Sequence, residues 1–131
     1  MATITEDYVN FEIAKLLKEK RFDVYGDGSF DSGIEVFAEY SPSGILNKCI
    51  DSKPHKKSYP APTLQMTMKW LREVHNLDII APPQFDSSKW TYSGIIFKLS
   101  IPCTEIRLND NKYKKEGACE AAIKYCLENL I

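Results

Sequence analysis

The stretch from residue 59 to residue 76 constrains the fold most, because it predicts one helix with both ends marked. One predicted face carries Leu64, Thr67, Met68, Leu71, Val74 and His75, with Met66 and Trp70 as a second stripe beside it. Thr63 follows two prolines and is suited to cap the first turn. Asn76 is suited to the left-handed conformation that closes a helix. A helix this apolar needs cover on more than one side, so we expect residues 63–75 to lie centrally.

Two further amphipathic helices are expected near residues 5–20 and 114–130. The first has Thr5 as its expected cap and an apolar stripe of Val9, Ile13, Leu16 and Leu17. The last has a stripe made of Cys119, Ala122, Ile123, Cys126, Leu127 and Leu130. Each helix therefore has one apolar face to bury.

Strand patterns fill the intervals between these helices, at 22–25, 34–40, 45–50, 77–81, 90–99 and 103–108. Turn residues such as Ser41-Pro-Ser-Gly44 separate some of them, and residues 85–89 are expected to form a loop. Short turns favour antiparallel pairing. The order therefore predicts an α+β, two-layer fold, with an antiparallel sheet and three helices packed mainly on one face. With 131 residues, the chain is expected to form a single domain, residues 1–131.

The composition bears on several classes of function. A net charge of −1 does not predict a polyanionic partner. No apolar run is long enough to span a membrane. The N-terminus lacks the basic start and apolar run of a secretory signal, so we expect a cytoplasmic protein. No phosphate-binding loop, dinucleotide fingerprint or metalloprotease motif occurs. We therefore assign no catalytic, cofactor-binding or metal-binding residues, expect no cofactor, and favour a non-enzyme.

Three segments of the chain carry a resemblance to known sequences. They are Tyr8-Val-x-Phe11-Glu-x-Ala14-Lys-Leu-Leu-Lys-Glu-Lys20, Pro60-x-Pro62-Thr63-x-Gln65-Met66-x-Met68-Lys-Trp-Leu-Arg-Glu-Val-His75, and the closing Lys124-Tyr-Cys-Leu-Glu-Asn-Leu-Ile131. Together they resemble a family of small uncharacterised proteins of Bacteroidetes genomes, prophages and mobile elements. Where that family usually has Gly, this chain has Arg21. The resemblance implies a bacterial or phage setting and a shared helical framework, and it implies no catalytic residues.

Aromatic residues on the predicted strands point to an interaction surface. Helices on one face of a sheet leave the other face uncovered, and exposed apolar patches mark partner sites. We therefore expect a protein-interaction surface that contains Tyr25, Phe37, Tyr40, Trp90 and Tyr92. The alternative is that the loops at 41–58 and 82–89 fold over this face. An unprotected strand edge at 103–108 also favours a homodimer, so a protein partner or a second copy is expected.

The loop at 48–59 supports a second hypothesis, a nucleic-acid-binding accessory protein. Basic and aromatic residues together can hold a single strand, and this loop offers Lys48, Lys53, Lys56, Lys57 and Tyr59. One basic loop in a chain of net charge −1 is more typical of a solvated surface than of a nucleic-acid site. Nucleic acid is therefore not the partner that we favour.

A small enzyme with a Cys–His site is the third hypothesis. His75 ends the central helix and could meet Cys119 or Cys126, and a cysteine nucleophile needs such an imidazole. The competing interpretation is that His75 caps helix carbonyls and that both cysteines are small core residues. The acidic segment 23–39 is interpreted as a solvated hairpin face, and cation binding by Asp27 and Asp31 is left open.

Overall fold

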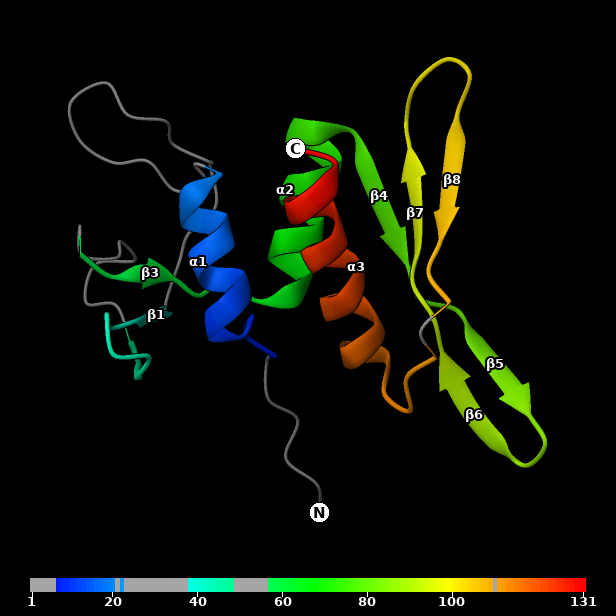
Figure 1. Ribbon diagram of the computed structural model, residues 1–131, viewed down its shortest axis with the longest axis horizontal. Helices are drawn as coiled ribbons and strands as arrows, with labels where there is room; N and C mark the ends of the chain where they lie inside the picture. Colours follow the sequence, from blue (N-terminus) through cyan, green and yellow to red (C-terminus); the bar gives the residue numbers. More distant parts are fainter. Residues whose placement is uncertain (1–6, 21, 23–37, 49–56, 110) are drawn as a thin grey trace. The chain divides into compact units, whose positions relative to one another are not determined.

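The computed structural model describes residues 7–20, 22, 38–48, 57–109 and 111–131 (Figure 1). Within these ranges lie three helices, α1 (Phe11–Glu19), α2 (Leu64–His75) and α3 (Lys115–Asn129), together with short antiparallel strands. The predicted α+β class is confirmed. The chain divides into two compact units, Met1–Met66 and Thr67–Ile131, while the expectation of a single domain stays a prediction.

The strands of the described residues form three small sheets, where the sequence predicted one. The first sheet has the order β2 (Leu46–Lys48), β1 (Ala38–Tyr40), β3 (Tyr59–Pro60), and the second has the order β4 (Leu77–Ile80), β7 (Ile95–Lys98), β8 (Thr104–Arg107). The third is a hairpin of β5 (Pro83–Asp86) and β6 (Lys89–Tyr92). Every pairing is antiparallel, as the short connections predicted.

In the first unit, α1 begins later than predicted. Its N-cap is Asn10, whose Oδ1 accepts a hydrogen bond from the Ile13 N–H at 2.8 Å. Residues 7–9 are not helical, because they pair with the chain that precedes α2: Val9 N–H donates to the Pro62 carbonyl at 3.0 Å. The predicted start near residue 5 is therefore wrong at residues 7–10, and the proposed Thr5 cap lies outside the described residues.

The β1–β2 hairpin has the turn that its sequence predicts. Gly44 has a φ of +89°, and its N–H donates to the Ser41 carbonyl at 2.8 Å. The turn approaches α1 closely, since a Cβ on Gly44 would lie 3.1 Å from Cδ2 of Phe11. Glu39, expected on a solvated face, is buried on β1, the central strand of this sheet.

Helix α2 has the ends that the sequence predicts. Met66 N–H donates to Oγ1 of Thr63 at 3.2 Å, and Asn76 has a φ of +57°. The buried face is rotated from the predicted one: Trp70 and Leu71 are buried, whereas Val74 is 44% exposed. The second apolar stripe therefore supplies more of the core than expected.

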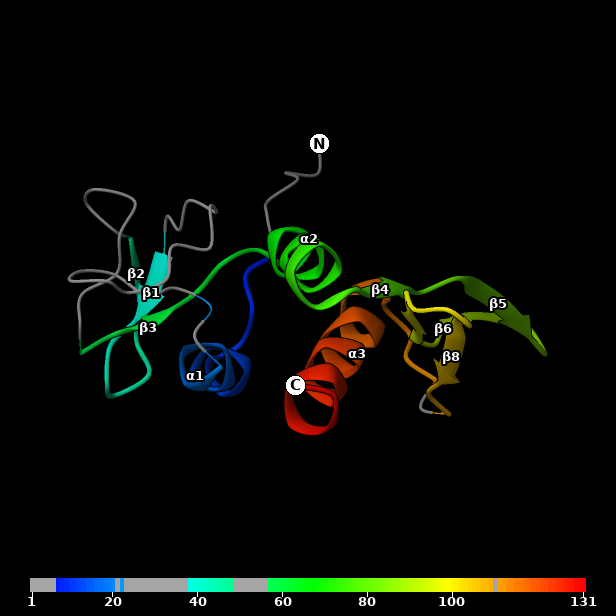
Figure 2. The ribbon, with the colours of Figure 1, turned by 90° about the horizontal axis from the view of Figure 1, so that it is seen from above.

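In the second unit, α3 packs against β4 and β6 (Figure 2). Ile79 and Ile96 stand opposite each other on β4 and β7, and both are buried. The predicted α3 stripe is buried from Cys119 to Leu127, while Leu130 is half-buried. This face is the core of the second unit.

The predicted strand at 90–99 is wrong, because it is divided into β6 and β7 at Ser93–Gly94. A Cβ on Gly94 would lie 2.9 Å from Cβ of Ala122 and 3.2 Å from the Ala118 carbonyl oxygen, so only glycine lets the backbone approach α3 here. The predicted loop at 85–89 is also wrong, since Phe85 belongs to β5 and Lys89 to β6.

Candidate functional site

The β5–β6 hairpin presents one aromatic face. Its strands join through a two-residue turn in which Ser87 has a φ of +61°. Phe85 stands opposite Trp90, and Pro83 opposite Tyr92, which places these four residues on one side of the hairpin. We call this side, Pro83, Phe85, Trp90 and Tyr92, the aromatic face.

The two central rings of the aromatic face lie against each other and against solvent. Their centroids are 5.1 Å apart with a tilt of 53°, a favourable aromatic geometry. The exposed fraction is nevertheless 64% for Phe85 and 57% for Trp90. Tyr92 is half-buried, and its backbone forms an isolated bridge to Lys112. Two large rings therefore remain available for contact with another molecule.

The opposite side of the hairpin is anchored. Thr91 is buried, and its Oγ1 donates to the Gln84 carbonyl at 3.5 Å. Lys89 places its Nζ 5.5 Å from the ring centroid of Tyr113, in the segment before α3. On this side Thr91 is therefore buried, while Gln84 and Lys89 are exposed.

Only part of the predicted aromatic surface gathers here. Trp90 and Tyr92 share the aromatic face, whereas Tyr40 belongs to the first unit. The Tyr40 ring packs against Phe11 with a centroid distance of 5.4 Å, and its hydroxyl donates to the Val9 carbonyl at 2.8 Å. Tyr40 therefore supports α1. Tyr25 and Phe37 lie outside the described residues.

Phe85 was missed because two prolines before it favoured a loop. The available signal was symmetry: Phe85 and Trp90 flank Ser87–Ser88 at equal distance, as cross-strand partners of a two-residue hairpin do.

The predicted basic loop is described only in part. Lys48 and Lys57 are exposed, while Lys53 and Lys56 lie outside the described residues. The Tyr59 ring is half-buried: it meets Phe11 edge-on at 5.5 Å and has the Lys18 ammonium 5.0 Å from its centroid. A ring already engaged by two side chains is poorly placed to stack on a base.

The predicted Cys–His pair has unfavourable electrostatics. Burial raises the pKa of the Cys126 thiol to about 12, and burial also raises the pKa of Cys119. Burial lowers the pKa of His75, whose ring meets Trp70 edge-on at 4.7 Å. Thiols with raised pKa values carry little thiolate near neutral pH, the opposite of what a nucleophile needs.

Metal binding and membrane spanning are two further functions on which the described residues bear. No group of three or more His, Cys, Asp or Glu among them is placed to hold a metal ion. Asp27 and Asp31 lie outside the described ranges, so cation binding there stays untested. In the same part of the chain, no helix combines the length and the apolar composition needed to cross a membrane.

Comparison with protein-family models, with curated proteins and with solved structures gives no match. The resemblance of the three helical segments to small Bacteroidetes and prophage proteins therefore stays a prediction.

Proposed function

We propose that this chain is a non-catalytic protein-binding module that contacts a partner through the aromatic face and also associates with itself. The observation that carries the proposal is the exposure of the tilted Phe85–Trp90 ring pair. Aromatic side chains are enriched among the residues that dominate binding energy, since they bury much area at little entropic cost.

A purely structural role for this pair is the competing explanation. A cross-strand aromatic pair stabilises its own hairpin by about 0.5–1.5 kcal/mol even when it stays exposed. Phe85 and Trp90 nevertheless each remain more than half exposed to water. Partner contact would bury that remaining area, which a role in the hairpin alone does not do.

Retention of partners by immobilised protein tests the proposal. The wild-type chain and Gln84→Ala are expected to retain the same protein from an extract of the source organism. Trp90→Ala and Phe85→Ala are expected to lose it, because they remove the rings of the aromatic face. Gln84 is a matched control, since it is exposed on the opposite side of the same hairpin. Equal retention by all four proteins would contradict the proposal.

A nucleic-acid-binding accessory role is the second proposal, and it has less support. Its exposed contributors are Lys48 and Lys57, while the Tyr59 ring is engaged by Phe11 and Lys18. Salt-sensitive retention of single-stranded DNA or RNA, weakened by Lys48→Ala and Lys57→Ala, would favour it over protein binding. The small-enzyme proposal is weakest, because the pKa values of both buried thiols are raised. A bacterial or phage origin and a cytoplasmic location complete the proposal.

A further inference from the structure

Among the described residues, no strand pairs with the outer edge of β8. In the described part of the chain, β8 is the last strand of the order β4–β7–β8 and pairs with β7 alone (Figure 1). Thr104, Glu105 and Arg107 are exposed, and Ile106 is half-buried. An open edge is a template for another strand.

The hydrogen bonds of β7 and β8 fix which backbone groups face that edge. Leu108 N–H donates to the Gly94 carbonyl at 3.0 Å, so this opposed pair is a hydrogen-bonded one. Hydrogen-bonded and non-bonded pairs alternate along an antiparallel ladder. Ile106 therefore directs its N–H and C=O toward β7, whereas Glu105 and Arg107 direct theirs outward.

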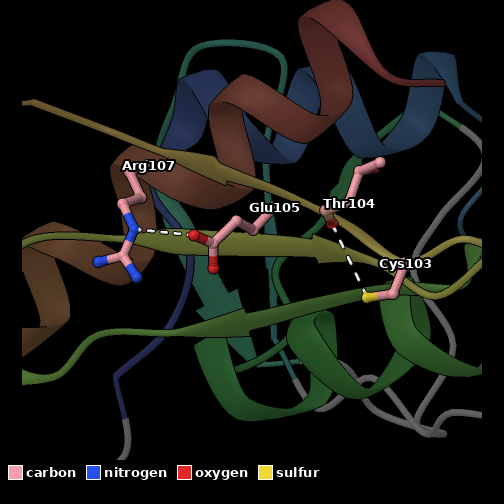
Figure 3. Close-up of polar contacts among 4 residues, drawn as sticks. All are labelled: Cys103, Thr104, Glu105 and Arg107. Atoms are coloured by element: carbon pink, nitrogen blue, oxygen red, sulfur yellow. Dashed lines mark hydrogen bonds and ion pairs between the residues drawn. The ribbon is translucent and has the colours of Figure 1, made fainter.

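The two residues with outward backbone groups also carry opposite charges. Glu105 and Arg107 are two positions apart, so their side chains share one face of the sheet. Figure 3 shows them joined by a contact of 3.1 Å between Arg107 Nε and Glu105 Oε1. Both side chains are largely exposed, which leaves them free to meet a further charge.

We propose that β8 pairs antiparallel with β8 of a second copy of this chain, about a two-fold axis at Ile106. Glu105 of each copy then stands opposite Arg107 of the other, and their outward N–H and C=O groups exchange hydrogen bonds. The two Ile106 side chains meet at the axis, on the face that also holds the buried Ile96. The two three-stranded sheets become one continuous sheet.

Charge favours this register over the two neighbouring symmetric registers, whose axes lie at Glu105 and at Arg107. A two-fold axis at Glu105 would place Glu105 opposite its own copy, and an axis at Arg107 would do the same for Arg107. Like charges directly opposite each other destabilise a strand pair. An axis between two residues would set inward-facing backbone groups against outward-facing ones, so the hydrogen bonds could not form. The second copy is therefore the partner whose charges match.

The inference rests on the self-association in the proposed function and does not involve the aromatic face. A single strand edge buries little area, so the dimer should be weak and dependent on concentration. The charges fix the register more than they add affinity, because exposed ion pairs contribute little.

Disulfide cross-linking tests the register. In a Cys49→Ser, Cys103→Ser background, the remaining thiols in the described residues, Cys119 and Cys126, are buried. Ile106→Cys should then cross-link two chains under mild oxidation, since opposed Cα atoms at a non-bonded pair lie about 4.5 Å apart. Thr104→Cys is the control: it would lie roughly 14 Å from its own copy, four residues along the strand, too far for a disulfide.

Charge exchange tests the pairing independently of oxidation. Glu105→Arg and Arg107→Glu should each weaken the homodimer roughly tenfold, because each variant places like charges opposite each other in the paired β8 strands. A mixture of these two variants should restore association as a heterodimer, since every opposed pair is again of opposite sign. Analytical ultracentrifugation would follow the change from the 15.0 kDa chain to twice that mass.

Each outcome separates this inference from the broader proposal. Cross-linking at Ile106→Cys but not at Thr104→Cys, with restored association in the mixture, supports antiparallel β8–β8 pairing about Ile106. A dimer that cross-links best at Glu105→Cys or Arg107→Cys, or that ignores the charge exchange, overturns the register while self-association stands. A monomer at all concentrations overturns both the β8–β8 pairing and self-association. Partner binding by the aromatic face would be unaffected.

Discussion

The second unit contains two regions that use the same residue types in opposite ways. Beneath α3 and along α2, Trp70 and Ile96 are buried, with exposed fractions of 1% and 0%. On the rim, which consists of the β5–β6 hairpin and the loop between β7 and β8, Trp90 and Ile101 are exposed. Residue type therefore does not separate the core from the rim. An apolar side chain on the rim gains little from folding, so contact with another molecule is its principal way to leave water.

Thiol reactivity should show the largest difference between the two regions. Cys103 is exposed on the rim, whereas Cys126 is buried on α3 with its pKa raised to about 12. Because the thiolate is the reactive form, we expect Cys103 to react with a thiol reagent at least ~10³-fold faster than Cys126 at pH 7.5. Mass spectrometry of labelled native protein measures both rates. Fast labelling of Cys119 or Cys126 before unfolding would reopen the enzyme hypothesis.

Core truncation should come next in size. Leu71 is fully buried mid-helix, so Leu71→Ala should lower the free energy of unfolding by ~2–5 kcal/mol through loss of contacts and a residual cavity. On the rim, Ile101→Ala should change it by less than ~0.5 kcal/mol. Urea denaturation of both variants measures the contrast. Equal losses would mean that the rim supports the fold as much as the core does.

Substituting Gly94 or Gly117 by alanine adds one methyl group at a crowded site and at an uncrowded site, respectively. Gly94→Ala should cost ~1–3 kcal/mol, because the added carbon would lie 2.9 Å from Cβ of Ala122. Gly117→Ala should instead add ~0.5–1 kcal/mol, because its site in α3 has ordinary contacts and alanine favours the helix. Thermal melts of the two variants should therefore shift in opposite directions. A stabilising Gly94→Ala would mean that α3 can move away from this turn.

The aromatic face is expected to contribute little to the stability of the fold. Trp90→Ala should lower the free energy of unfolding by only ~0.5–1.5 kcal/mol, the range of an exposed aromatic pair. Gln84→Ala on the other side should stay within ~0.5 kcal/mol. Chemical denaturation monitored by circular dichroism is the measurement. A loss above ~3 kcal/mol for Trp90→Ala would mean that the Trp90 ring is needed for the stability of the fold, and it would weaken the partner-binding proposal.

Local signals in the sequence determined the ends of α2 and the extent of α3. The Thr63 cap and the Asn76 terminator act within one turn of their helix, and helical periodicity depends on residues three and four apart. The Ser41–Gly44 turn and the strand at 103–108 were also predicted, because turn chemistry and alternation are equally local. Trp90 and Tyr92 were recognised as candidate contacts by their type and strand pattern.

Contacts between distant segments decided what the sequence did not show. The start of α1 moved to Asn10 because residues 7–9 pair with residues 62–64, and the strand at 90–99 broke where Gly94 meets Ala122. The outer edge of β8, which pairs with no further strand among the described residues, depends on which strands become neighbours. Pairing and exposure are properties of segments brought together by the fold, so no window of neighbouring residues specifies them.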